Sequence, residues 1–245
     1  MASTRAIVLS KENFGEADQY IQFLTRDWGV ITLLARSSRK SKRRYVGGLD
    51  LFCHDEISLR GGIPTHSQKK PYLNELLVLN SFPKMRESLD KLLEAGRAAQ
   101  WVRKLLPNPS PMPTVYTLFG QTLALIEKEE NTEKLEMLSL IFRLKLLSAI
   151  GLRPQTNFCA RCENEFNLVI FDRPSGGMIC ENCARAHRLI EADLIEQDEH
   201  QLLRAAEHLK LSAAVALQFP QEKVKHLLRV TTGFASYHTH QKLPL

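Results

Sequence analysis

The sequence has no long apolar run, and only 7% of its 245 residues are aromatic. A helix that spans a bilayer needs about 20 mainly apolar residues, and no segment approaches that length. The first ten residues, Met1 to Ser10, also lack the apolar stretch of a secretory signal peptide. We therefore expect a soluble, cytoplasmic protein with no membrane partner.

Catalytic motifs are also missing. No G-x-x-x-x-G-K-[ST] phosphate loop, no G-x-S-x-G and no H-E-x-x-H segment occurs in the sequence. These motifs hold the phosphates of a nucleotide, a nucleophilic serine and a catalytic zinc ion, respectively. The 8 histidines are scattered, and no pair of carboxylates stands out for acid–base chemistry. We therefore expect a protein that is not an enzyme.

The charge is unevenly distributed in an otherwise ordinary globular composition of 44% hydrophobic and 24% charged residues. The chain carries 33 Lys and Arg against 27 Asp and Glu, and the net charge of +6 favours a polyanionic partner. Residues 1–80 hold 12 basic and 8 acidic side chains, which is +4 of this excess. A polyanion is therefore expected to bind the N-terminal region.

The first 80 residues have the pattern of a small β-barrel. Branched and apolar runs separated by glycine-containing turns predict five strands, at residues 5–9, 20–24, 30–34, 49–59 and 73–79. Closure into a barrel is favoured because it leaves no exposed sheet edge. The pattern fits a five-stranded OB-fold barrel and an SH3-like barrel equally well.

The rest of the chain has helical periodicity. Apolar residues recur at spacings of three and four, and they predict helices at about residues 85–106, 114–130, 133–150 and 221–238. Four prolines between Pro107 and Pro113 cannot continue the first helix, so it should stop at Pro107 and Asn108–Pro113 is expected to be a rigid connector. Gly151 suits a left-handed C-cap after the third helix.

These patterns together predict an α+β protein. We expect an N-terminal OB-fold barrel followed by a helical domain that carries a four-cysteine zinc-binding insert. The expected boundaries are residues 1–80 for the barrel, 81–154 and 191–245 for the two parts of the helical domain, and 155–190 for the insert.

Four of the five cysteines form two Cys-x-x-Cys pairs, Cys159 with Cys162 and Cys180 with Cys183, and 17 residues separate the pairs. This spacing is expected when two thiolate pairs share one tetrahedral zinc ion. Four thiolates leave no open coordination position, so the zinc would be structural. Thiol redox chemistry and an iron–sulfur cluster remain alternatives. Cys53 lies in a strand-like run and is expected to be a buried apolar residue.

A basic segment lies between the third and fourth predicted strands. It contains six cations and no carboxylate: Arg36, Arg39, Lys40, Lys42, Arg43 and Arg44. Such clusters bind phosphates through counterion release, and OB-fold loops use aromatic rings as platforms for bases. We interpret the six side chains as a nucleic-acid-binding site, with Tyr20, Trp28 and Tyr45 as candidate platforms. A solvated loop without a ligand is the alternative.

Short segments in a particular order extend this interpretation. They are Arg5–Leu9, Phe14–Asp18, Thr25–Gly29, the basic run up to Leu49, Phe142–Leu147, Gly151–Pro154 and Cys159-x-x-Cys162. Together they resemble the RecO family of bacterial recombination mediators over most of the chain. Ser37 stands where that family is expected to have glycine, and Leu51 where proline is expected, so the loop keeps its charge more clearly than its shape. Some family members lack the cysteines, which agrees with a structural zinc.

The resemblance implies a DNA repair protein of the RecF pathway that is associated with the nucleoid. Such a protein binds single- and double-stranded DNA and anneals complementary strands. With RecR, it helps to load RecA onto DNA coated by the single-stranded DNA-binding protein SSB, whose acidic C-terminal tail recruits it. It needs no ATP of its own. A zinc-ribbon RNA-binding or transcription factor is the alternative within binding proteins, and a thiol oxidoreductase is the alternative among enzymes.

Overall fold

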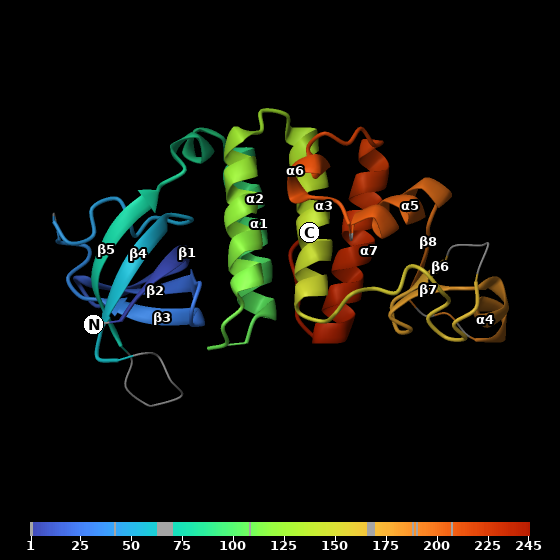
Figure 1. Cartoon of the computed structure of the whole chain (residues 1–245), viewed down its shortest axis with the longest axis horizontal. Helices are drawn as coiled ribbons and strands as arrows, with labels where there is room; N and C mark the ends of the chain where they lie inside the picture. Colours follow the sequence, from blue (N-terminus) through green and yellow to red (C-terminus); the bar gives the residue numbers. More distant parts are fainter. Residues whose placement is uncertain are drawn as a thin grey trace. The chain divides into compact units, whose positions relative to one another are not determined.

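The structure is a computed structural model that describes residues 2–41, 43–62, 71–107, 109–165, 170–187, 189, 191–206 and 208–245. The chain forms two compact units, Met1–Lys128 and Glu129–Leu245, and each is described by itself (Figure 1). The domain boundaries expected at residues 80, 154 and 190 stay predictions.

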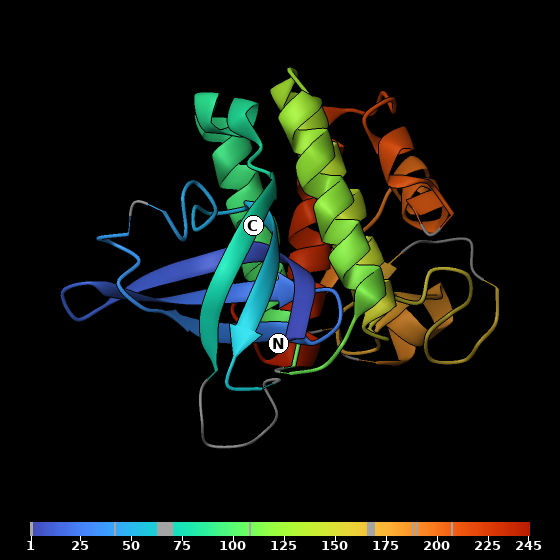
Figure 2. The same cartoon turned by 60° about the vertical axis from the view of Figure 1, so that its left-hand side comes forward.

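The first unit begins with a closed barrel of five strands. They are β1 (Ala2–Phe14), β2 (Asp18–Thr25), β3 (Gly29–Ala35), β4 (His54–Arg60) and β5 (Tyr72–Asn80). Their order is β1-β2-β3-β5-β4, and pairing of β1 with β4 closes the barrel. Only β3 and β5 pair in parallel among these neighbours. This is the OB-fold, so the first of the two barrel predictions is confirmed; Figure 2 shows the strands, blue to teal, curving around one another.

The barrel core consists of alternate residues of the strands, because successive side chains point to opposite faces. It includes Ala6, Val8, Ile21, Phe23, Ile31, Leu33, Ile57, Leu59 and Leu73. Cys53 is fully buried in the same core, as predicted. Ile7 points to the opposite face and is also buried, because Gly120 of helix α2 (Pro113–Lys128) lies against it. One end of the barrel's outer face is therefore covered by helix.

The fourth strand begins later than the sequence predicted. Residues 49–53 were expected to be extended, but β4 begins only at His54. Val8 donates a backbone hydrogen bond to Cys53 at 3.0 Å and accepts one from Phe52 at 2.9 Å. Phe52 also has a φ of +70°, which no strand residue adopts. These contacts hold the segment against β1 as a turn.

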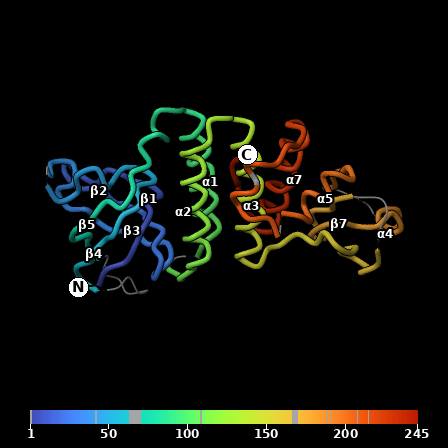
Figure 3. The backbone as a smooth tube through the Cα atoms, turned by 45° about the horizontal axis from the view of Figure 1, so that its top comes forward, coloured from blue at the N-terminus to red at the C-terminus, as the bar shows by residue number. Residues whose placement is uncertain are grey.

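Helices complete the first unit. They are the 3₁₀ helix η1 (Pro83–Glu87), α1 (Leu89–Leu105) and α2 (Pro113–Lys128), and α1 and α2 lie side by side (Figures 1 and 3). A single helix was expected from residue 85, but Ser88 has extended backbone and its side chain accepts a hydrogen bond from the Lys91 N–H. This cap starts α1 anew, because serine at an N-cap satisfies a backbone donor that would otherwise have no partner.

The connector between α1 and α2 packs on the turn between β2 and β3. Gly29 has a φ of +70°, and a Cβ at this position would overlap the backbone carbonyl of Ser110. Only glycine meets both requirements without strain. The Trp28-Gly29 turn and the proline-rich connector therefore form one packed element.

The second unit contains a pair of long helices, α3 (Thr132–Ala149) and α7 (Gln221–Thr239), with α5 (Gln197–Ala206) and α6 (Leu211–Ala214) beside them (Figure 1). Gly151 has a φ of +80°, so the predicted left-handed residue after α3 is confirmed. The insert contains β6 (Ile170–Asp172), β7 (Gly177–Ile179) and α4 (Glu181–Ala186), and β8 (Ala192–Leu194), just beyond its predicted end, pairs with β6. Its sheet has the order β7-β6-β8. None of the helices described in either unit has the length and apolarity to cross a membrane.

Candidate metal centre and nucleic-acid interface

The four predicted cysteine ligands lie together. The sulfur atoms of Cys159, Cys162, Cys180 and Cys183 all lie within 4.8 Å of one another. Cys162 Sγ and Cys180 Sγ are 3.7 Å apart. Four sulfurs placed tetrahedrally at about 2.3 Å from one zinc ion would be about 3.8 Å apart. The cluster could therefore hold one metal ion.

Each Cys-x-x-Cys pair is shaped by its own backbone contacts. In the first pair, the Glu163 N–H donates to the Cys159 carbonyl at 2.9 Å, and Glu163 has a φ of +60°. In the second pair, Cys180 is the N-cap of α4, and its sulfur accepts from the Cys183 N–H at 3.5 Å. The Cys180 N–H in turn donates to Cys159 Sγ at 3.3 Å, which links the two pairs.

The electrostatics of the cluster favour a cation at its centre. Burial disfavours the Cys159 thiolate, but backbone N–H groups, first that of Cys180, outweigh it and lower the pKa of Cys159 to about 6. The pKa of Cys183 is raised to about 12, chiefly by its hydrogen bond with the Cys180 sulfur. Four thiolates this close repel one another, so they cannot all be deprotonated without a cation between them. A bound metal ion would offset this repulsion. Cys159 is only 1% exposed, which opposes exchange with an external thiol.

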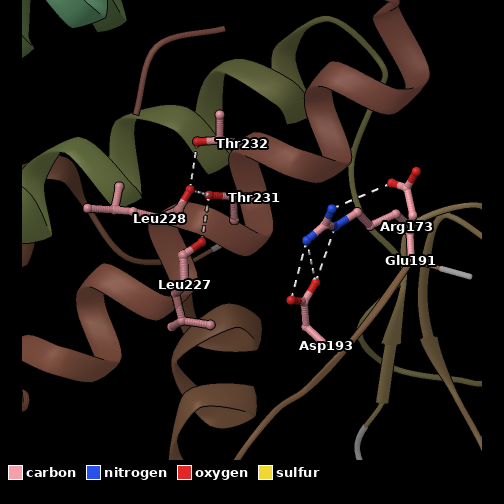
Figure 4. A network of polar contacts seen from close by, with 7 residues as sticks. All are labelled: Arg173, Glu191, Asp193, Leu227, Leu228, Thr231 and Thr232. Atoms are coloured by element: carbon pink, nitrogen blue, oxygen red, sulfur yellow. Dashed lines mark hydrogen bonds and ion pairs between the residues drawn. The ribbon is translucent and has the colours of Figure 1, made fainter. Parts of the chain in front are cut away.

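The insert contacts α7 around Arg173, and Figure 4 shows this side chain with its two carboxylate partners. Arg173, just after β6, makes a forked ion pair with Asp193 of β8, with Nη2 at 2.9 Å from Oδ2, and a longer one with Glu191. Its guanidinium lies on Gly233, where a Cβ would be only 2.6 Å from Cζ. His238 Nε2 donates to the Arg173 carbonyl at 2.8 Å. The rings of Phe171 and Phe234 meet edge to face at 5.7 Å.

The basic segment forms a loop that is anchored on the turn between β1 and β2. The Ser37 N–H donates to the Asp18 carboxylate at 2.7 Å, and the Arg39 N–H donates to the Ala17 carbonyl at 3.0 Å. Ser37 has a φ of +55°, the conformation that a glycine would adopt without strain. The loop therefore has a defined path even though serine replaces the expected glycine.

The described cations of this loop are exposed residues. Arg36, Arg39, Lys40, Arg43 and Arg44 are all exposed, and within the described residues no carboxylate lies in ion-pair range of any of them. Lys42 lies outside the described residues. The Arg44 guanidinium donates to the Arg36 carbonyl at 2.7 Å, which bends the loop back on itself. Five of the six predicted site residues thus lie together on one exposed segment.

The candidate aromatic platforms differ in exposure. Tyr45 is 5% exposed and its hydroxyl donates to the Leu73 carbonyl at 3.1 Å, so it is a core residue. Trp28 packs against the barrel core. Tyr20 lies on the outer face and its ring centroid is 4.8 Å from that of Phe14, which is 50% exposed. The sequence interpretation missed Phe14, although its position directly before the Gly15 turn is a signal for an exposed hairpin end.

Family models match nearly the whole chain. The model described as "Recombination protein O N terminal" matches residues 1–72, and "Recombination protein O C terminal" matches residues 86–244. The chain belongs to the RecO family. The resemblance found in the sequence is thereby confirmed, and with it membership of a DNA repair and recombination family.

Individual relatives agree with the family models. A protein named DNA repair protein RecO from Dehalococcoides mccartyi is 33% identical over 184 residues, 74% of this chain and 69% of its own length. The protein of the same name from Myxococcus xanthus is 32% identical over 180 residues, 73% and 70% of the two chains. That from Acetivibrio thermocellus is 25% identical over 232 residues, 94% and 89% of the two chains.

Proposed function

We propose that this chain is a non-enzymatic mediator of DNA repair that binds single- and double-stranded DNA through the loop of residues 36–44 and anneals complementary strands. In this role it acts with RecR to load RecA onto SSB-coated DNA, and the acidic tail of SSB recruits it. The names of its relatives, DNA repair protein RecO, support the general role.

The observation that carries the proposal is the anchored loop of cations without carboxylate partners among the described residues. Because the loop's backbone is held to the β1–β2 turn at Ser37 and Arg39, DNA binding costs little further ordering of the loop. Cations near one another lower the repulsion between two phosphate backbones, and that repulsion is the main barrier to bringing two strands together. The loop could therefore serve both binding and annealing.

We further propose that Cys159, Cys162, Cys180 and Cys183 hold one structural zinc ion. The sulfur spacing and the donor set fit zinc, and four thiolates complete its coordination. Bound zinc would supply a cross-link between the two Cys-x-x-Cys pairs. The residues themselves orient the sulfurs through the backbone N–H groups of Cys180 and Cys183.

The test is annealing of complementary oligonucleotides, bare and SSB-coated, without nucleotide and at low and high salt. We expect annealing of both kinds of strand, and we expect it to slow as salt rises because salt weakens phosphate contacts. Sequence-selective binding of RNA without annealing would overturn the proposal in favour of the zinc-ribbon alternative.

Two matched variants locate the DNA-binding surface. Lys40→Ala/Arg43→Ala removes two cations from the loop, and Lys210→Ala/Arg229→Ala removes two exposed cations from the second unit. The slope of log affinity against log salt for single strands should shrink by about 1.4 in the loop variant, since each phosphate contact contributes about 0.7. The control should keep the wild-type slope. Equal losses in the two variants would show that the loop is not the site.

A further inference from the structure

A row of aromatic and apolar side chains crosses the outer face of the barrel beside the basic loop. Tyr20 of β2 is paired with Leu34 of β3, and Leu34 is paired with Tyr72 of β5. Residues directly opposite on paired strands share a face. Their sequence neighbours Ile21, Leu33 and Leu73 fill the core, so this row faces outward.

Phe14 extends the row at the end of β1. Its ring lies 4.8 Å from that of Tyr20, tilted by 53°, and half of the residue is exposed. A large apolar side chain with this exposure is unusual at a hairpin end, where polar residues are the norm. Phe14, Tyr20, Leu34 and Tyr72 are called the aromatic row below.

The aromatic row is bordered by the cations of the loop. The Arg36 guanidinium lies over the Tyr72 ring, with Cζ 3.7 Å from the ring centroid. Arg39 donates from Nη1 to the Glu16 carbonyl at 3.2 Å, so its charge is held at the hairpin turn next to Phe14. On the other side, Glu12 of β1 is opposite Tyr20. A phosphate backbone would therefore run along the loop side of the row.

We propose that the aromatic row is a stacking surface for the unpaired bases of single-stranded DNA, with the loop cations holding the phosphates. The inference rests on the proposed DNA binding and assigns to it a contact that a duplex cannot make, since duplex bases are already stacked. Stacking on aromatic rings tolerates any base sequence, as a mediator requires. The geometry also separates two contributions to the affinity for DNA. The contribution of the loop cations depends on salt, and that of the aromatic row does not.

The experiment compares the affinity for a dT oligonucleotide with that for an abasic oligonucleotide with the same number of phosphates. The wild-type chain should bind dT at least about fivefold more tightly, because stacking of one base is worth about that factor or more. Phe14→Leu, which keeps an apolar side chain, should lose most of this preference and bind the abasic strand as the wild type does. Lys40→Ala/Arg43→Ala should weaken binding of both strands.

Phe158→Leu is the matched control, since Phe158 is 49% exposed and lies in the second unit. It should keep the full preference for dT. Phe14→Trp gives an independent readout that does not depend on the stability of the leucine variant: its added fluorescence should be quenched by the dT strand and not by the abasic one.

Equal affinity of the wild type for the two strands would overturn the stacking surface and leave the proposed function standing. The same holds if the fluorescence added by Phe14→Trp responds equally to the dT and abasic strands. Failure of the wild type to bind either strand would overturn the proposed function itself.

Discussion

The N-terminal barrel and the cysteine-bearing insert are both small β structures, yet different forces hold them together. The barrel closes its hydrogen-bond ladder on itself and encloses an apolar core with residues from all of its strands. The insert has strands of only three residues, and its buried cluster in the described residues consists of Ile170, Ile179 and two of the cysteines, Cys159 and Cys180. The barrel is stabilised by its core, and the insert has a much smaller buried cluster of its own.

The comparison shows how a short segment of chain can be ordered without a core of its own. Apolar burial stabilises by about 25 cal/mol per Å². The insert's buried apolar side chains, Ile170, Phe171, Met178 and Ile179, are few against the entropy of ordering some 30 residues. The proposed zinc ion would supply stabilisation locally by joining the two Cys-x-x-Cys pairs, and the forked Arg173–Asp193 pair lies in the same region. The barrel has enough buried surface to need neither.

Loss of the cysteine ligands should have the largest effect, and it should destabilise the insert without affecting the barrel. Cys159→Ser/Cys180→Ser should release the metal and unfold the insert, because structural zinc sites contribute about 10 kcal/mol or more to folding. Hydrogen exchange should show lost protection at β6 and β7 and unchanged protection in the barrel. Metal analysis should find about one zinc per wild-type chain and none in the variant.

Cys53→Ala is the control for that experiment, since Cys53 is a fully buried cysteine of the barrel. It should retain the zinc. A wild-type chain without metal but with reactive Cys-x-x-Cys thiols would contradict the structural site and favour the thiol oxidoreductase alternative.

Substitutions at two glycines test how the β2–β3 turn packs on the proline-rich connector, and their expected effect is smaller. Gly29→Ala should destabilise the first unit by about 2–4 kcal/mol, because it adds left-handed backbone strain and displaces Ser110. Gly15 also has a positive φ, +61°, but no atom lies within 4 Å of its Cβ position. Gly15→Ala should therefore cost only about 1 kcal/mol. Urea denaturation measures both, and equal losses would contradict the packing of the connector on the turn.

A buried carboxyl makes the barrel's stability depend on pH. Asp55 of β4 is fully buried, and neither of its carboxyl oxygens has a hydrogen-bond partner among the described residues. Burial raises the pKa of Asp55 to about 8. Between about pH 4 and pH 8 the folded chain therefore holds a proton that the unfolded chain has lost, and stability falls as pH rises.

Asp55→Asn should remove this dependence. The wild type should lose up to about 1.4 kcal/mol per pH unit through that window from Asp55 alone, and the variant should show a flatter profile. Asp50→Asn removes a carboxylate from an exposed position just before β4 and is the control, whose curve should parallel that of the wild type. Thermal unfolding followed from pH 4 to pH 8 measures the three curves, and parallel curves for Asp55→Asn and wild type would contradict the assignment.

Local patterns predicted much of the fold and of the metal centre. Alternating apolar residues placed the strands, the proline-rich stretch ended α1, and the cysteine spacing predicted a cluster that the structure brings within 4.8 Å. These features depend on residues close together in the chain. The late start of β4 could not be predicted in this way, because Phe52 and Cys53 are held by hydrogen bonds to Val8, about 45 residues earlier. The break at Ser88 has a local cause, the cap on the Lys91 N–H, and the helical periodicity alone did not indicate it.

The composition of both candidate sites can be read directly from the sequence: six cations in nine residues, and two thiol pairs at a spacing that suits one metal ion. The strand order was needed to distinguish an OB-fold from an SH3-like barrel, and the folded chain was needed to distinguish the buried Tyr45 from the exposed Phe14. The physical reason is that strand pairing joins residues far apart in the chain. The face on which an aromatic ring lies depends on that pairing and not on the ring's immediate neighbours.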